Sequence, residues 1–112
     1  MASEFKQIIT NATAASGSAE FVVEDMKRWT GRLIMTVAGG SQTVTYAVKL
    51  RAYQGESSAN AYVKHSGTVT ANTDVLINNN DGDGAPITAY SVLVEWSANN
   101  NMVINSGFRK EY

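Results

Sequence analysis

The most regular feature of the chain is an alternation of apolar and polar residues over positions 43–53, TVTYAVKLRAY. Val44, Val48 and Leu50 fall on one side of this alternation, and mostly polar residues fall on the other. Because successive side chains of a strand point to opposite faces, the pattern predicts a half-buried β-strand. Residues 32–38, RLIMTVA, alternate in the same way just before it. The glycine pair between the two segments predicts a tight hairpin.

Shorter runs of the same kind predict further strands. They are separated by segments rich in Gly, Asn and Ser, which favour turns. The last of them carries a glycine, Gly107, where we expect a kink. The predicted strands cover residues 4–10, 20–25, 61–71, 73–78, 87–98 and 102–112.

Residues 18–30 allow two interpretations. Val22, Met26 and Trp29 recur at the spacing of one helix face, which predicts a short helix. The adjacent β-branched Val22 and Val23, and the strands predicted on either side, favour a strand followed by a turn. Both alternatives remain open at this stage.

Seven or eight short strands separated by turn residues are typical of an all-β fold. We predict one domain over residues 1–112, an antiparallel two-sheet β-sandwich of jelly-roll or immunoglobulin-like kind, with the short helix near 18–30 as a variant. The chain has no cysteine, so the Cys–Trp–Cys pattern of true immunoglobulin domains is missing.

The amino-acid composition excludes several classes of function. A chain without cysteine has no disulfides, no thiolate metal ligands and no cysteine nucleophile. Nine basic and ten acidic residues give a formal net charge of −1, without the concentrated basic patch of a nucleic-acid-binding surface. No stretch approaches the ~20 apolar residues of a membrane span, and the first residues lack the features of a secretory signal. We expect neither nucleic acid nor membrane as a partner.

Residues 78–84, NNNDGDG, could in principle bind calcium. On an EF-hand template, Asp81 and Asp83 would be ligands, but Tyr90 would stand where a bidentate glutamate is required. Asn, Asp and Gly are also the residues that turn a chain. We therefore predict an inter-strand loop and no cofactor, with a looser calcium site as the alternative.

No arrangement of residues predicts catalysis. His65 is the only histidine, and the adjacent Ser66 would point to the opposite face of a strand. No Gly-x-Ser-x-Gly nucleophile elbow is present. Among the acids, Glu24 and Asp25 lie beside basic residues and indicate a solvated turn. We expect the chain not to be an enzyme.

Three aromatic residues in polar surroundings are candidates for contact with a ligand, most plausibly a glycan, because exposed rings can stack on sugars. The alternative is that some aromatic residues form the core and the others border it. The candidates are Trp29, Tyr53 and Tyr62, and those expected in the core are Tyr46, Tyr90 and Trp96.

Some strands carry apolar residues on both faces. Ile34 lies opposite the side of Leu33 and Met35, and Leu93 interrupts the polar side of its strand. Burial on both sides of a thin sandwich would require that part of an outer face meets a neighbour.

The low charge, the many Thr, Ser, Asn and Gly residues and the strand layout resemble small bacteriophage virion structural proteins, such as capsid decoration (cement) proteins and the β-modules of tails and fibres. The resemblance covers the whole chain and includes no diagnostic motif. It implies a non-enzymatic protein made in the host cytoplasm without a signal peptide, located in the virion. It also implies contacts with the major capsid protein and with copies of itself, often as a homotrimer. The alternative is a carbohydrate- or receptor-binding β-sandwich module of fibre-tip or adhesin type.

Overall fold

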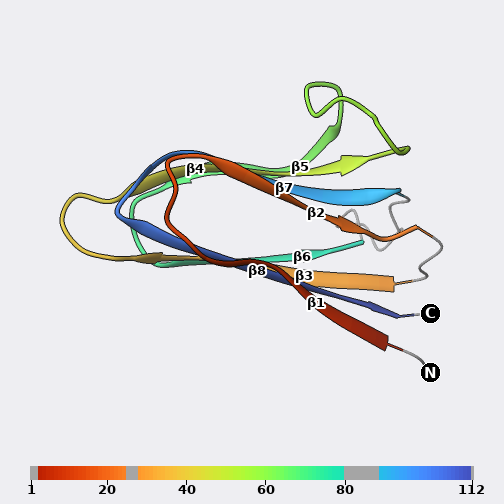
Figure 1. Cartoon of the computed structure of the whole chain (residues 1–112), viewed down its shortest axis with the longest axis horizontal. Helices are drawn as coiled ribbons and strands as arrows, with labels where there is room; N and C mark the ends of the chain where they lie inside the picture. The colour runs from red at the N-terminus through yellow and green to blue at the C-terminus, as the bar shows by residue number, and fades with distance from the viewer. Residues whose placement is uncertain (1–2, 25–27, 80–88, 112) are drawn as a thin grey trace.

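The computed structural model describes residues 3–24, 28–79 and 89–111, which form eight β-strands and no helix (Figure 1). The predicted all-β sandwich is confirmed, and all strand pairs are antiparallel. The strands are β1 (Ser3–Ala12), β2 (Gly17–Val22), β3 (Arg28–Val37), β4 (Thr43–Arg51), β5 (Tyr62–Val69), β6 (Thr73–Asn78), β7 (Ser91–Asn100) and β8 (Met102–Glu111).

The strands form two four-stranded sheets that pack face to face, as Figure 1 shows in side view. One sheet has the order β1-β8-β3-β6 and the other β2-β7-β4-β5. Successive strands change sheet at almost every step, and β4 and β5 are the one consecutive pair that is hydrogen-bonded among the described strands. Of the two sandwich types expected, this is the jelly-roll arrangement.

The hairpin predicted between residues 32–38 and 43–53 is wrong. Gly39 and Gly40 have the positive φ angles of a turn, 127° and 65°, but β3 and β4 lie in different sheets. Alternation shows which face of a strand is apolar, but it does not show which strand lies beside it. Two consecutive strands can bury their apolar faces side by side in one sheet or opposite each other across the core. β3 and β4 lie opposite each other.

The two interpretations of residues 18–30 are also resolved. β2 ends at Val22, Glu24 lies in a turn, and β3 begins at Arg28. The prediction of a strand followed by a turn is confirmed, and the described residues of this segment form no helix. Met26, one residue of the predicted helix face, lies outside the described residues. At Gly107, where a kink is expected, β8 pairs with β3 without a register shift. Its pairing with β1 is irregular at this point, since the register shifts between Gln7 and Ile9, opposite Gly107 and Ser106.

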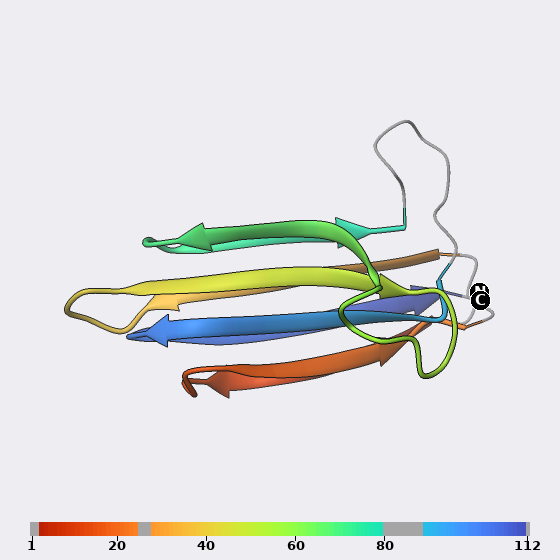
Figure 2. The ribbon, with the colours of Figure 1, turned by 90° about the horizontal axis from the view of Figure 1, so that it is seen from above.

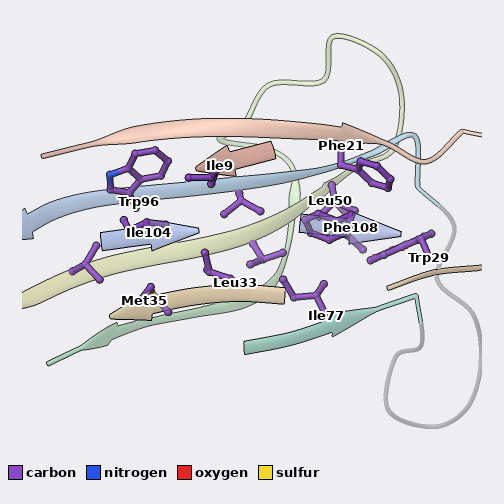
Figure 3. Packing of buried hydrophobic residues seen from close by; sticks show 14 of the residues in the cluster. Ile9, Phe21, Trp29, Leu33, Met35, Leu50, Ile77, Trp96, Ile104 and Phe108 are labelled. Carbon is purple, nitrogen blue, oxygen red and sulfur yellow. The ribbon is translucent and has the colours of Figure 1, made fainter. Parts of the chain in front are cut away.

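The core is a cluster of apolar side chains between the two sheets (Figure 3). Near the end where the termini lie, the Phe21 and Phe108 rings stack with centroids 5.1 Å apart and planes 16° apart. Trp29 packs on Phe108 at 6.4 Å with its plane tilted by 55°. Toward the other end, Trp96 lies in the core and its Nε1 donates a hydrogen bond to the Ala14 carbonyl at 3.0 Å.

Two of these core rings lie against glycines of the neighbouring strand. Gly31 of β3 is in register with Phe108, and a Cβ added to it would come within 2.2 Å of the Phe108 ring. Gly17 of β2 is in register with Trp96, and a Cβ there would come within 2.4 Å of the indole. Each ring thus fills the space that a side chain on the next strand would occupy.

We predict that Gly31→Ala destabilises the fold strongly. The fully buried Phe108 ring cannot move away from the new methyl group without displacing the core. Overpacking of this kind costs about 2 to 3 kcal/mol, or a fall in Tm of about 10 °C for a chain of this size. The matched control is Gly67→Ala, where the new Cβ would lie 3.4 Å from Tyr46 in ordinary contact. Thermal melts should separate the two variants, and equal Tm values would contradict the account.

Candidate interaction surface

The structure separates the three candidate ligand-contact aromatics. Trp29 is only 2% exposed and is part of the core, so it cannot offer a stacking surface to a ligand. Tyr53 and Tyr62 are each 61% exposed, at the two ends of the connection between β4 and β5. Contact with a ligand remains a prediction for these two tyrosines.

The remaining sequence candidates give no site. His65 and Ser66 are both exposed on the edge strand β5. Most of the 78–84 segment lies outside the described residues, so its calcium alternative is not decided. Within the part of the chain that is described, no three acidic or histidine side chains gather in a way that could hold a metal ion. The same residues include no helix long and apolar enough to cross a membrane.

The outward side of the β2-β7-β4-β5 sheet, called the closed face below, carries two ion pairs. Arg51 Nη1 lies 2.8 Å from Glu20 Oε2, and Lys49 Nζ lies 2.8 Å from Glu95 Oε1. Ser91 Oγ also donates a hydrogen bond to Glu20. The charges on this face therefore largely satisfy each other within the chain.

The loop between β4 and β5 is bound to the closed face through Ser58. The Ser58 hydroxyl donates to Glu95 Oε2 at 2.6 Å and accepts from Lys49 Nζ at 3.0 Å. Figure 2 shows this loop lying across the ends of β4 and β7. Leu93, outward-facing on β7, is only 5% exposed. Its burial is provided by the chain itself, so it does not require the neighbour that the sequence analysis invoked.

Both acids of the closed face have lowered pKa values. For Glu20 the main cause is the hydrogen bond from Ser91, reinforced by Arg51 and opposed by burial. For Glu95 burial is the largest single influence and raises the pKa, but the hydrogen bonds from Lys49 and Ser58 and the nearby positive charges together outweigh it. A lowered pKa means that the charged form is stabilised, which fits a structural network better than a proton donor.

The outward side of the β1-β8-β3-β6 sheet, called the open face below, exposes large apolar side chains. Phe5 on β1 is 62% exposed and Leu76 on β6 is 70% exposed. Across the sheet, Leu76 is in register with Arg32, and Arg32 with Gly107. The Phe5 ring lies over Gly107, since a Cβ on that glycine would come within 2.8 Å of it.

The open face is hollowed beside Gly107, which has no side chain on this face. A depression of about 360 Å³ lies between Phe5 and Leu76, and Gly31 and Gly107 contribute to its lining. A second depression, of about 230 Å³, continues toward Ile34 and also touches Phe5 and Gly107. Both are open at the surface, and both combine the Phe5 ring with polar and charged side chains such as Arg32. Such a lining suits contact with another protein surface better than enclosure of a small molecule.

One ion pair accompanies these hollows. Arg32 binds Asp74 through two hydrogen bonds, one from Nη2 and one from Nε at 3.3 Å. The pair neutralises both charges at the surface, while Arg109 lines the larger hollow.

Sequence reasoning missed Phe5 and Leu76. A signal was present for Leu76, because it stands between Val75 and Ile77 and makes that short strand apolar on both faces. The same two-sided apolar pattern marks Ile34 in the sequence, and Ile34 is half-buried on this same face. No sequence signal places Phe5 over Gly107, since the two residues come from opposite ends of the chain.

We predict that Glu20→Gln destabilises the fold at neutral pH by about 1 kcal/mol, since a partly exposed, hydrogen-bonded ion pair is lost. A carboxylate whose pKa is lower in the folded than in the unfolded chain stabilises the fold above its ordinary pKa of 4.5. That contribution disappears as the pH falls below 4.5 and through the folded value.

The free energy of unfolding, measured by denaturant titration across this pH range, should therefore differ between parent and Glu20→Gln at pH 7 and converge in acid. The control is Glu4→Gln, because Glu4 is half exposed and lies 3.7 Å from Lys110. It should change stability by less than about 0.5 kcal/mol. A gap for Glu20→Gln that does not narrow in acid would rule out the proposed charge interaction.

Comparison with known proteins identifies the fold and no family. No family profile and no curated protein sequence matches the chain. Among solved structures it is similar to YomS, an SPBc2 prophage-derived protein, with a TM-score of 0.56 and 12% identity over 99% of this chain and 96% of that one. It is also similar to a Bacillus endospore appendage protein, with a TM-score of 0.50 and 9% identity over 97% and 85% of the two chains. A weaker likeness, with a TM-score of 0.41 and 12% identity, covers 98% of this chain and 31% of a particle protein of infectious bursal disease virus.

Proposed function

We propose that this chain is a non-enzymatic structural protein of a phage particle, and specifically a capsid decoration protein that binds the outside of the shell. The observation that carries the proposal is the asymmetry of the two outer faces. One carries internal ion pairs, a bound loop and a hollow with many polar side chains, and the other exposes Phe5 and Leu76 beside two hollows.

The comparisons support assembly as the class of function. YomS comes from a prophage, and its likeness runs over nearly the whole of both chains. The endospore appendages are pili, which are polymers of protein subunits. Those pili are disulfide-linked, whereas this chain has no cysteine. Any assembly of these 112 residues therefore uses no disulfide bond.

The mechanism is stabilisation by buried area. Apolar surface removed from water contributes about 25 cal/mol per Å², and a standard interface buries about 800 Å² on each partner. A decoration protein repeats such a contact many times over a symmetric shell, so modest affinities add up to mechanical reinforcement. No reacting group is needed for that role.

The partners in this proposal are the major capsid protein and further copies of the chain, and the place of action is the virion. The resemblance to decoration proteins implies three copies as the expected unit on the shell. Imaging of decorated shells would count them.

The second candidate function is a carbohydrate- or receptor-binding module. The observation that favours it is the pair of exposed rings, Tyr53 and Tyr62, at the two ends of one connection. Exposed tyrosines offer apolar faces on which sugar rings can stack, with a hydroxyl available for hydrogen bonding.

Two binding measurements separate the candidates. We predict saturable, stoichiometric binding to emptied shells of the phage that encodes the chain, and no signal on a glycan array. The double variant Tyr53→Ala/Tyr62→Ala should bind shells as the parent does, because its substitutions lie away from the open face. Glycan binding that the double variant loses, together with absent shell binding, would establish the module function and refute the decoration role.

A further inference from the structure

We propose that the open face docks a second copy of this chain about a twofold axis, with Leu76 of each copy seated in the larger hollow of the other. The inference goes beyond the proposed function: the shell contact would use the same open face, so on any one copy pairing and shell binding exclude each other. It commits to one occupant of the hollow and one symmetry.

The open face carries both halves of a complementary contact. Leu76 projects from β6 and is 70% exposed, the largest exposed fraction of the large apolar side chains that are described. The hollow beside it has Phe5 on one side and Leu76 on the other, with Gly107 and Arg32 on the two strands between them. A leucine side chain entering from above would meet the Phe5 ring and the edge of Leu76.

Because Leu76 and the larger hollow lie on the same face, two copies can bind each other through identical contacts. A twofold axis that runs between Leu76 and its copy places each leucine in the hollow of the other molecule, and the two contacts are identical by symmetry. The exposed apolar side chains of both copies are then covered at once. A head-to-tail contact would bury one leucine and leave the other exposed.

The charges near the axis allow this approach. Arg32 is held by its own Asp74, so the axis brings together two neutral ion pairs instead of two bare cations. Like charges brought together at an interface are what usually prevents self-association. Arg109 lies in the lining of the hollow, where its long side chain can extend toward water at the rim.

The area is sufficient for a weak, specific dimer. Four strands spaced about 4.8 Å apart, with a rise of about 3.3 Å per residue, present a face of roughly 600 Å². Two such faces together approach the lower end of standard interfaces, about 1,200 Å². We therefore expect association that depends on concentration. The closed face has a hollow too, of about 420 Å³, but polar side chains such as Thr45, Glu95 and Ser97 contribute much of its lining. The loop held by Ser58 covers another part of that face.

The first experiment measures the mass of the full chain over a dilution series by analytical ultracentrifugation. The parent should pass from two chains to one on dilution. Leu76→Glu places two carboxylates beside the axis and should weaken the association at least about 100-fold, and its melting temperature should stay close to that of the parent. The matched control is Tyr53→Glu, which changes a similarly exposed residue on the connection between β4 and β5 and should leave the association unchanged.

A second experiment uses the absence of cysteine. Leu76→Cys introduces the only thiol of the chain, close to the proposed axis. Mild oxidation, or a short thiol-specific cross-linker, should join two chains through this position rapidly. Tyr53→Cys, treated in the same way, should cross-link slowly and only at high concentration.

The possible outcomes keep this inference separate from the proposed function. A parent that remains a monomer at all concentrations but binds shells refutes the pairing and leaves the decoration role intact. So does a trimer, or a dimer that Leu76→Glu leaves unchanged, because the contact must then involve another surface. A parent that forms dimers lost in Leu76→Glu but binds no shell supports the pairing and refutes the decoration role. Absence of both dimer and shell binding refutes both.

Discussion

The packing of aromatic rings against glycines of the neighbouring strand is the constraint on which the rest of this structure depends. Phe108 fills the space above Gly31, and Trp96 fills the space above Gly17. Each ring can occupy its place only if the strands keep their register, because any other residue than glycine would collide with it. One contact lies in each sheet, so both sheets are pinned at the core. The stacked Phe21 ring then joins the two layers across the sandwich.

A ring packed over a glycine also occurs on the outer surface of the β1-β8-β3-β6 sheet. Phe5 lies over Gly107 on the open face as Phe108 lies over Gly31 in the core. Inside the sandwich the ring closes the space, whereas outside it borders a hollow that no described residue fills. On the closed face the chain covers part of its own surface, through Ser58 and the ion pair of Lys49 and Glu95. Exposed apolar side chains gathered on one face are typical of a site that contacts another molecule.

The closed face also shows why polar side chains on a β-sandwich need not indicate chemistry. A serine, a lysine and a glutamate within hydrogen-bonding distance could suggest an activated nucleophile, and Ser58, Lys49 and Glu95 form such a group. Here, however, the glutamate pKa is lowered, and the lysine is paired with it at 2.8 Å. The carboxylate is therefore held in its charged form, with the ammonium group and the serine hydroxyl both bonded to it. The group attaches a loop to a sheet.

The sequence by itself determined most of the strands and, in the regularly alternating ones, the side that enters the core, because alternation is a local property of the chain. Val44, Val48 and Leu50 were assigned to the core from spacing alone, and all three are buried. The partner of each strand was decided only by the tertiary structure. The glycine pair at 39–40 is compatible with a hairpin and with a crossing between sheets, and the choice depends on how all eight strands share one core. The burial of Trp29 and Leu93, and the meeting of Phe5, Gly107 and Leu76 on one face, depend on that choice too, because they join residues that are distant along the chain.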